Sequence, residues 1–342
     1  AAFVIPFLLF AAPAGSLADR LPKSRMITTL KGVEGLVALL AVAALAFGLE
    51  NGLYGVVFLM AAHSAFFAPA KYGIIPELVK KEELSKANGL IESCTFLGII
   101  GGTALASLLS LVTAERPWLA ACFSLTVALA GLWSASTIEA TEARAPGKKV
   151  ALFPGEIFRT ISDIRSDRDL MLAIIGLAFF MFVAAFTQMN LIGYGMERLG
   201  LDEARSGYLF LAAALGIGIG SLLSANLSGR NVEFGIVPIG AAGITASALL
   251  LHAAPENLAA CLGIVVIFGI SAGLFSLPLQ TFIQFSAEPS RRGQVLAAST
   301  FISWIGIFLA SGVIYLFSKI MGLSAAGGFS VLGVLTLVLT IL

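Results

Sequence analysis

Apolar stretches long enough to cross a membrane recur along the whole chain. A spanning helix needs about 20 mostly apolar residues, and eleven stretches approach or exceed this length. They cover residues 1–17, 27–49, 52–75, 88–112, 117–138, 170–194, 206–228, 232–252, 257–285, 294–318 and 325–342. The first and the last of these look clipped. The pattern predicts an all-α, polytopic membrane protein.

The positions of Lys and Arg predict how these helices are oriented, because cytoplasmic loops retain basic residues. The connections that follow the first, third, fifth, seventh and ninth stretches, together with the adjoining ends of the stretches, hold 17 of the 21 Lys and Arg residues. The remaining connections hold only four, which are Arg116, Arg198, Arg205 and Lys319. The first stretch is therefore expected to run from outside to inside, and the loop 139–169 is expected to be cytoplasmic.

The loop 139–169 is the one long hydrophilic stretch, and it separates five apolar stretches from six. It predicts an N-terminal helical half (1–138), a cytoplasmic linker (139–169) and a C-terminal helical half (170–342). With one further helix before Ala1, which we expect to be missing here, the halves would hold six helices each in the same orientation.

A weak internal repeat supports two related halves. Gly15-Ser16-Leu17 recurs as Gly220-Ser221-Leu222, and a basic residue follows each Gly ten positions later, at Arg25 and Arg230. Phe66 and Pro69 similarly recur as Phe275 and Pro278. Two matches in the same order and at nearly equal offset favour duplication.

The composition excludes several other classes of protein. Hydrophobic residues make up 58% of the chain and charged residues only 12%, against about a quarter charged in soluble domains. The net charge of +1 gives no basic field for nucleic acid. The three Cys and two His form neither a disulfide framework nor a zinc motif. Because no catalytic constellation and no Walker motif is present, we expect neither an enzyme nor ATP, cofactor or metal dependence.

The first cytoplasmic loop carries a distinctive motif. It runs Gly15-Ser16-Leu17-Ala18-Asp19-Arg20-Leu21-Pro22-Lys23-Ser24-Arg25 and resembles the loop signature of the major facilitator superfamily, although Pro22 stands where the family has a second Gly. The resemblance implies two pseudo-symmetric helical halves with a central site that opens alternately to the two sides of the membrane. It also implies that Asp19 docks at the helix after Arg291 and Arg292, and that these residues close the cytoplasmic side. The predicted gating residues are Gly15, Asp19, Arg20, Lys23, Arg25, Arg291 and Arg292.

Three further segments narrow the resemblance. The segments His63–Pro76, Lys31–Glu34 and Asn88–Leu97 resemble the lysophospholipid transporter family, including the transporter module fused to acyltransferase and acyl-carrier-protein synthetase domains in some bacterial chains. The family implies inward flipping of lysophospholipid, chiefly lysophosphatidylethanolamine, across the bacterial inner membrane for reacylation. The implied partners are membrane lipids and an acyltransferase or acyl-ACP synthetase, fused or separate.

Ionisable side chains inside apolar helices are candidates for a substrate site, because they usually face a cavity or a partner. His63, Phe67 and Lys71 share one helix face, and Glu34 and Glu92 lie within their helices. A zwitterionic head needs one cation and one anion, which these residues supply. Alternatively, Glu34 or Glu92 pairs with Lys31 or Lys71 only to hold helices together, and His63 bonds a backbone carbonyl. The predicted substrate-binding residues are Glu34, His63, Lys71, Glu92, Asn88, Gln188, Asn190 and Gln280.

Other interpretations stay open at this stage. An ion-coupled exporter of small amphipathic molecules would use Glu34, Glu92 or His63 as its titrating group. The chain is alternatively the membrane module of a fused phospholipid acyltransferase whose chemistry lies beyond Leu342, or a scaffold or receptor. The run Gly216-Ile217-Gly218-Ile219-Gly220 is not a nucleotide loop. The pairs Gly216/Gly220, Gly98/Gly102 and Gly269/Gly273 instead predict close helix packing.

Overall fold

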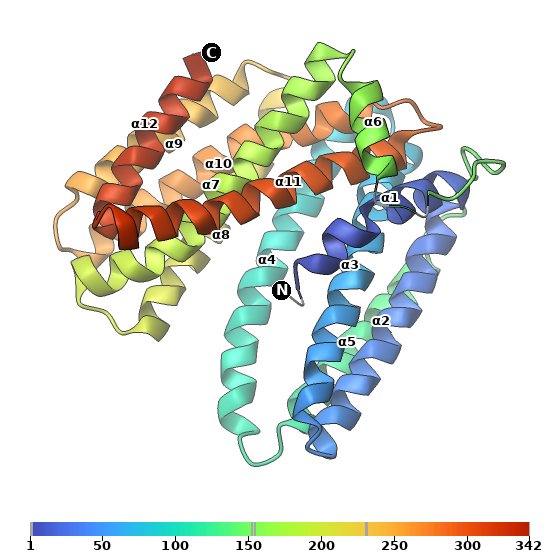
Figure 1. The fold of residues 1–342 in the computed structure, drawn as a ribbon, viewed down its shortest axis with the longest axis horizontal. Helices are drawn as coiled ribbons and strands as arrows, with labels where there is room; N and C mark the ends of the chain where they lie inside the picture. The colour runs from blue at the N-terminus through green and yellow to red at the C-terminus, as the bar shows by residue number, and fades with distance from the viewer. Residues whose placement is uncertain (1–2, 152, 154, 230–231, 342) are drawn as a thin grey trace. The chain divides into compact units, whose positions relative to one another are not determined.

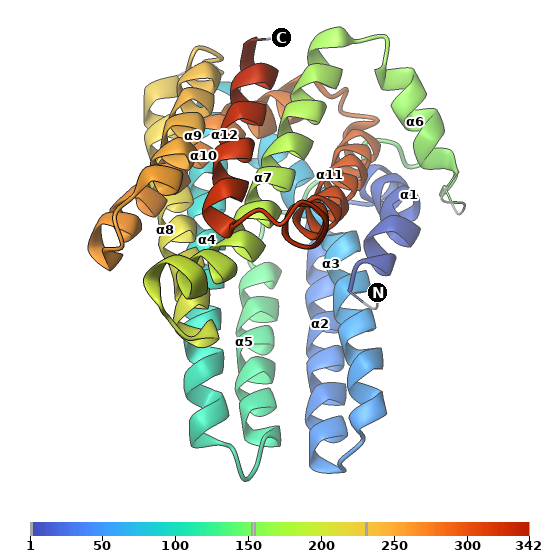
Figure 2. The same cartoon turned by 60° about the vertical axis from the view of Figure 1, so that its left-hand side comes forward.

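A computed structural model describes residues 3–151, 153, 155–229 and 232–341. Within this part of the chain every regular element is helical, which confirms the all-α prediction (Figures 1 and 2). Arg230, a member of the sequence repeat, lies outside the described residues. The α-helices are α1 (Ile5–Arg20), α2 (Lys23–Ala46), α3 (Glu50–Leu78), α4 (Leu84–Val112), α5 (Trp118–Ser136), α6 (Glu156–Ile164), α7 (Arg168–Leu199), α8 (Glu203–Ser228), α9 (Ile236–Ala253), α10 (Leu258–Ser286), α11 (Arg292–Tyr315) and α12 (Ala325–Ile341).

The helices account for the apolar stretches of the sequence. In the described residues nine segments are long and apolar enough to cross a membrane. The first and last stretches form the shorter helices α1, with 16 residues, and α12, with 17. The structure adds α6, a short helix in the linker that the sequence analysis does not predict. One face of α6 is buried through Ile157, Thr160 and Ile164, so a helical face with about one buried residue per turn orders this segment.

The described chain divides into two compact units. The first unit comprises residues 1–80, 102–171 and 283–304, and the second comprises residues 81–101, 172–282 and 305–342. The first unit therefore holds α1, α2, α3, α5 and α6, together with the end of α4, the beginnings of α7 and α11 and the end of α10. The second holds α8, α9 and α12, most of α7 and α10, the beginning of α4 and the end of α11. Each unit includes a piece of the other half of the sequence, and the predicted division at 139–169 stays a prediction.

In the first unit α2 packs against both α3 and α5, and α1 packs against α3; Figures 1 and 2 show α2 and α3 side by side. Small and apolar side chains form a core here, including Ala18, Met26 and Ala70. Large apolar side chains on α2 are instead exposed, among them Leu36 at 63%. Lipid tails are as apolar as leucine, so outward leucines suit a helix that faces the bilayer.

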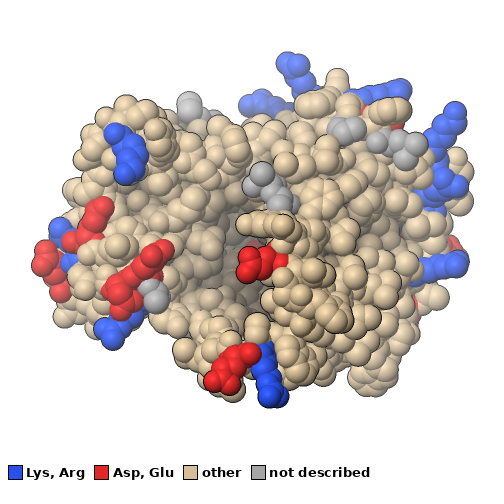
Figure 3. All heavy atoms as spheres, turned by 60° about the horizontal axis from the view of Figure 1, so that its bottom comes forward, with Lys and Arg blue, Asp and Glu red and all other residues tan. Residues whose placement is uncertain are grey.

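The surface agrees with a lipid environment. On the face drawn in Figure 3 most atoms belong to residues that are neither acidic nor basic, and the charged side chains stand in small groups. A soluble domain carries charges of both signs across its surface. Nine apolar helices and this surface make the chain a multi-pass membrane protein.

In the second unit α8 and α10 approach closely through glycines. A Cβ at Gly220 would overlap the carbonyl oxygen of Ile270, and a Cβ at Gly269 would overlap that of Ala213. These contacts match the predicted packing role, because small residues let helix backbones meet. Gly98 and Gly102 differ, since a Cβ at either meets no described atom within 4 Å. The packing role predicted for that pair is wrong in this structure.

Replacing Gly220 should therefore destabilise the protein. Gly220→Ala forces a Cβ against the backbone of α10, and overpacking of this kind costs about 1–3 kcal/mol. We expect the melting temperature of the detergent-solubilised protein, measured by tryptophan fluorescence, to fall clearly. The matched variant Gly98→Ala adds a methyl group in open space and should leave the melting temperature nearly unchanged. Equal effects of the two substitutions would contradict close packing at Gly220.

Candidate functional site

Asp19 joins the end of α1 to the beginning of α11. Its side chain is fully buried. Oδ1 accepts a hydrogen bond from the backbone N–H of Gly293 at 2.6 Å, and Oδ2 accepts a longer one from Gln294 at 3.3 Å. Both amides belong to the first turn of α11, where N–H groups lack helical partners and carry partial positive charge. The carboxylate thus lies at the position that the loop motif predicts.

A cation from the linker completes this contact. Lys148 Nζ donates to Asp19 Oδ2 at 3.0 Å and to the carbonyl oxygen of Ser290 at 3.1 Å. Asp19 lies outside the predicted membrane span 1–17. Burial raises the pKa of its carboxyl above the usual value, whereas Lys148 and the two backbone amides act to lower that pKa. Asp19, Lys148 and the first turn of α11 are called the α1–α11 latch below.

Glycines allow the backbones of the latch to approach. A Cβ at Gly15 would lie 2.7 Å from the Cβ of Ala297 and 2.8 Å from the carbonyl oxygen of Gly293. A Cβ at Gly293 would lie 2.8 Å from Asp19 Oδ1. Larger residues at either position would push the carboxylate away from α11. This explains why a Gly precedes Asp19 by one helical turn.

The linker lies against the first unit through several backbone contacts. The N–H of Ala145 donates to the carbonyl oxygen of Asp19 at 2.9 Å, and the N–H of Ala151 donates to Ser16 Oγ at 2.9 Å. Thr141 and Ser24 exchange hydrogen bonds, each backbone N–H donating to the other side-chain oxygen. The linker therefore forms part of the latch region, which its hydrophilic sequence alone does not predict.

The other predicted gating residues have varied surroundings. Lys23 is buried and pairs with Glu77 at 2.8 Å, and Arg144 approaches the same Glu77 oxygen at 3.4 Å. Arg292 donates to the carbonyl oxygens of Gln284 and Ala287 at the end of α10. Arg291 pairs with Asp163 on α6, and Arg20 and Arg25 are exposed. Basic groups favour helix C-termini, so Arg292 has a clear structural role in ordering the α10–α11 turn.

A charged cluster lies inside the first unit on α2 and α3. Lys31 Nζ lies 2.7 Å from Glu34 Oε2, and His63 Nε2 lies 3.6 Å from the same oxygen. The ring of Phe67 stacks against His63 with a centroid separation of 5.7 Å, and Lys31 lies 5.1 Å from its centroid. We call these four residues the Glu34 cluster. Lys31 was not among the predicted site residues, although it lies one helical turn before Glu34.

Lys71 follows His63 by about two turns of α3, and its Nζ lies 5.1 Å from the ring centroid of Tyr72. Glu34, His63 and Lys71 are thus in one unit, as their helix positions predict. His63 is the most enclosed of the cluster, with 5% of its side chain exposed. Glu34 and Lys31 are about one-fifth exposed.

A second polar set lies between α4 and α10 in the second unit. Ser276 Oγ donates to Glu92 Oε1 at 3.0 Å, and Asn88 Nδ2 donates to Thr281 Oγ1 at 3.3 Å. Gln280 is half-buried on the same stretch of α10. Six of the eight predicted substrate residues therefore form two sets, one in each unit. Their combination in one binding site stays a prediction.

Gln188 and Asn190 lie on α7. Asn190 Nδ2 donates to the carbonyl oxygen of Ala325 at 2.8 Å, so it holds α7 to α12, while Gln188 is exposed. Asn190 also lines a cavity of about 100 Å³ together with Glu197. Glu197 Oε2 accepts from the backbone N–H of Ala325 at the beginning of α12. The bond from Asn190 gives this side chain a structural role, because it holds α7 to α12.

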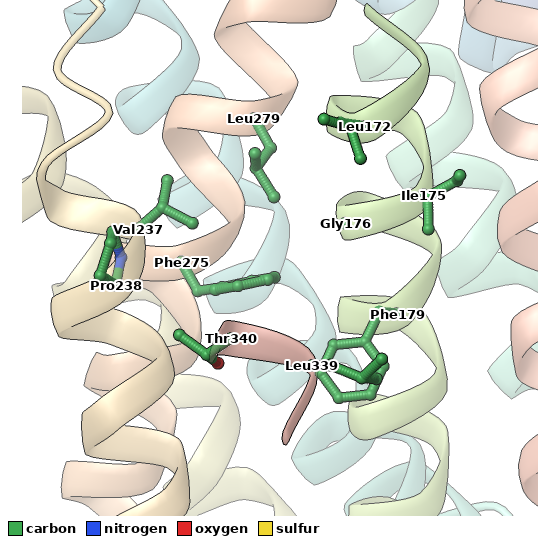
Figure 4. Close-up of a pocket in the computed structure, with 10 residues that line it drawn as sticks. All are labelled: Leu172, Ile175, Gly176, Phe179, Val237, Pro238, Phe275, Leu279, Leu339 and Thr340. Carbon is green, nitrogen blue, oxygen red and sulfur yellow. The ribbon is translucent and has the colours of Figure 1, made fainter. Parts of the chain in front are cut away.

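An apolar cavity of about 270 Å³ lies among α7, α9, α10 and α12 (Figure 4). Phe179 and Phe275 face into it, and Thr340 provides a hydroxyl at its lining. The full lining consists of Leu172, Ile175, Gly176, Phe179, Val237, Pro238, Phe275, Leu279, Leu339 and Thr340. Such a surface suits hydrocarbon and offers no charged group to a polar ligand.

Comparison with known proteins identifies the family. The model of the Major Facilitator Superfamily matches residues 1–311. The chain belongs to the Major Facilitator Superfamily. Among solved structures it is similar to the fucose:proton symporter FucP of E. coli, with a TM-score of 0.80 and 15% identity over 99% of this chain and 88% of that one. The human organic anion transporter MFSD10 gives a TM-score of 0.79 and 17% identity, covering 99% and 81%. At these identities the likeness concerns the fold.

Curated relatives are more similar in sequence. The lysophospholipid transporter LplT of Enterobacter sp. (strain 638) is 29% identical over 286 residues, which cover 82% of this chain and 69% of the relative. LplT of Escherichia fergusonii is 28% identical over 296 residues, covering 84% and 70%. The superfamily resemblance read from the loop motif is confirmed, and the narrower resemblance agrees with these relatives.

The α1–α11 latch can be tested by thiol accessibility. In a background without the three native cysteines, a cysteine at the buried position Ala297 reports whether α1 and α11 separate. Asp19→Asn removes the charge-assisted bonds, each worth about 1.5–3 kcal/mol, so we expect labelling by an impermeant maleimide from the cytoplasmic side to accelerate about tenfold or more.

Two neighbouring lysines provide a second test of the latch and its matched control. Lys148→Gln should also accelerate labelling, because Lys148 bonds both Asp19 and Ser290. Lys149→Gln removes an adjacent exposed charge and should leave the labelling rate unchanged. Equal labelling in the Asp19→Asn variant and the parent protein would show that the carboxylate does not hold the two helices together.

Proposed function

We propose that this chain is a secondary transporter that flips lysophospholipid inward across the bacterial inner membrane by alternating access. The observation that carries the proposal is the similarity to LplT proteins over more than four-fifths of the chain. The superfamily membership supplies the general activity, since its members are membrane transporters with two helical halves. Lysophosphatidylethanolamine is the proposed main substrate.

The charged side chains within the apolar helices support a zwitterionic substrate. A lysophosphatidylethanolamine head carries an anionic phosphate and a cationic ammonium. In this proposal Glu92 or Glu34 binds the ammonium, and Lys71 or His63 binds the phosphate. Ionisable groups within spanning helices cost a few kcal/mol each unless they have a partner or a cavity, which favours a functional reason for keeping them.

The single acyl chain of the substrate needs apolar surroundings. The cavity between α7 and α10 offers them in the second unit (Figure 4). It lies on α10 next to the polar set, because Phe275 lines the cavity and its neighbour Ser276 binds Glu92. One helix thus presents an apolar and a polar surface, which suits a molecule with a tail and a head.

The proposal also assigns a gate to the α1–α11 latch and an enzyme partner to the transporter. The α1–α11 latch joins the N-terminal and C-terminal parts of the sequence on the predicted cytoplasmic side, and we infer that it opens to release substrate there. The released lysophospholipid would be reacylated by an acyltransferase or acyl-ACP synthetase, fused or separate. The direct test is uptake of labelled lysophosphatidylethanolamine, compared with lysophosphatidylcholine, by the protein in liposomes.

A charge-neutral variant tests the binding site. Glu92→Gln keeps an oxygen that accepts from Ser276 but removes the negative charge. We expect the initial rate of lysophosphatidylethanolamine uptake to fall about tenfold, as for the loss of one charge-assisted bond to an ammonium. Uptake of lysophosphatidylglycerol, whose head has no ammonium, should change much less.

Two further variants complete this prediction. Glu82→Gln removes an exposed charge just before α4 and should retain full uptake of both lipids. Lys71→Gln should slow both lipids, because both carry the phosphate. Unchanged uptake in the Glu92→Gln and Lys71→Gln variants would remove these two residues from the site, while absence of uptake by the parent protein would contradict the proposed function.

A further inference from the structure

The small cavity that Asn190 and Glu197 line is chemically unlike the apolar cavity of Figure 4. It has a volume of about 100 Å³, and all its lining residues belong to the second unit. They come from the end of α7, the end of α11 and the beginning of α12, which the basic-residue pattern places on the outer side of the membrane. Ser318 and Ser324 add hydroxyl groups, and none of these lining residues is basic.

Glu197 is the acidic residue of this cavity. Its Oε2 accepts a hydrogen bond from the backbone N–H of Ala325 at 2.8 Å, which caps the beginning of α12. Among the described residues Oε1 takes part in no hydrogen bond, and Glu197 belongs to no ion pair. The adjacent cation, Arg198, donates instead to the carbonyl oxygen of Ala254 at 2.7 Å. The carboxylate therefore offers an accepting oxygen that α12 does not use.

The other walls of the cavity also suit a cation. Asn190 donates through Nδ2 to the carbonyl oxygen of Ala325, which leaves its own oxygen Oδ1 as an acceptor. Gly328 permits this position of Asn190, because a Cβ there would lie 3.2 Å from Oδ1. The rings of Phe186 and Phe317 form an apolar wall, with centroids 6.1 Å apart in an edge-to-face arrangement. Aromatic faces attract cations.

The chain widens into a π-helical turn where α11 borders the cavity. This turn, Leu316–Ile320, ends with the N–H of Met321 donating to the carbonyl oxygen of Leu316 at 2.9 Å, five residues earlier. Such turns are rare and are frequently found at functional sites. The turn contains Ser318, which lines the cavity, and directly after it the exposed Lys319. A basic residue thus follows the lining of a cavity that holds an acidic one.

We propose that this cavity is an entry subsite that receives the ammonium group of the lipid head from the outer leaflet. The inference rests on the proposed function. The ammonium donates to Glu197 Oε1 and Asn190 Oδ1 beside the two phenylalanine rings, while the phosphate stays at the rim, where Lys319 neutralises it. Each charge of the zwitterion then has an opposite charge as its partner, and the complex carries no net charge.

The size of the cavity makes the subsite selective. A volume of about 100 Å³ accommodates roughly three water-sized groups at about 30 Å³ each. The ammonium nitrogen and the two methylene carbons of an ethanolamine head fill this space. A choline head adds three methyl groups and has no N–H to donate, so it neither fits nor forms the two hydrogen bonds. The phosphate and the glycerol remain outside.

Thiol protection tests the subsite without transport. In a background without the three native cysteines, Ser318→Cys places a thiol at the lining, and an impermeant maleimide labels it from outside in right-side-out membrane vesicles. Glycerophosphoethanolamine, which is the lipid head without its tail, should slow this labelling several-fold at millimolar concentration. Glycerophosphocholine at the same concentration should leave the labelling rate unchanged.

A matched pair of acidic residues tests the role of the carboxylate. Glu197→Gln keeps an oxygen for the N–H of Ala325 but loses the charge, so the melting temperature should change little while the protection disappears. Glu203→Gln removes an exposed charge at the beginning of α8, on the same predicted outer side, and should retain full protection. Lys319→Gln should weaken protection by glycerophosphoethanolamine but not by ethanolamine, which has no phosphate.

Uptake measurements separate this inference from the proposed function. Glu197→Gln should raise the concentration of lysophosphatidylethanolamine that gives half-maximal uptake about tenfold, and change that of lysophosphatidylglycerol much less. Equal labelling of Ser318→Cys with and without glycerophosphoethanolamine would overturn the subsite, even if the parent protein takes up lipid. Protection that persists in Glu197→Gln would overturn the assignment to Glu197. Intact protection without any lipid uptake by the parent protein would contradict the proposed function alone.

Discussion

Charged side chains in an apolar bundle need partners, and this requirement organises the structure. Removing an ion from water costs several kcal/mol even after the protein relaxes. The buried Lys23 and Asp19 accordingly have ion-pair partners in Glu77 and Lys148. Lys31 and Glu34 pair within α2. Each pair fixes the position of a helix end or a helix face, so the same charges that are expensive to bury also determine which helices meet.

The α1–α11 latch is the clearest case of this principle. A carboxylate at the end of one helix meets the free N–H groups at the beginning of another, and both partners are charged or dipolar. Glycines at both contact points let the backbones approach. Lys148 neutralises the remaining charge and ties the linker to the same place. A contact built from several moderate bonds of this kind can close firmly and still open, as the proposed alternating access requires.

The hydrophobic pattern predicts the helices well, because a bilayer requires long apolar segments with all backbone groups bonded internally. The motif around Gly15 and Asp19 also predicts the docking on α11, through its resemblance to a known signature. The pattern does not reveal partners distant in the chain. Lys148 and Asp19 are 129 residues apart, and Glu77 gives no local signal that it pairs with Lys23. A helical turn such as Lys31–Glu34 does give such a signal, and the structural alternative for Glu34 named this pair, which the structure contains.

Two further features lie beyond the sequence pattern. The helix α6 is short and amphipathic, so an apolar window of membrane length does not detect it. Glycine spacing alone does not separate contact from exposure, since Gly216/Gly220 pack against α10 and Gly98/Gly102 do not. The division into two units that exchange parts of α4 and α11 also depends on long-range contacts, which the order of helices does not define.

We have proposed that charged side chains within the apolar helices bind the head of a zwitterionic lipid. Photo-crosslinking with a lysophosphatidylethanolamine that carries a diazirine at its head tests this most directly, with the labelled peptides found by mass spectrometry. The account predicts crosslinks at the peptides around Glu34, His63 and Glu92 that unlabelled lysophosphatidylethanolamine competes away. Crosslinks confined to exposed apolar positions such as Leu36 and Leu39, without competition, would contradict it.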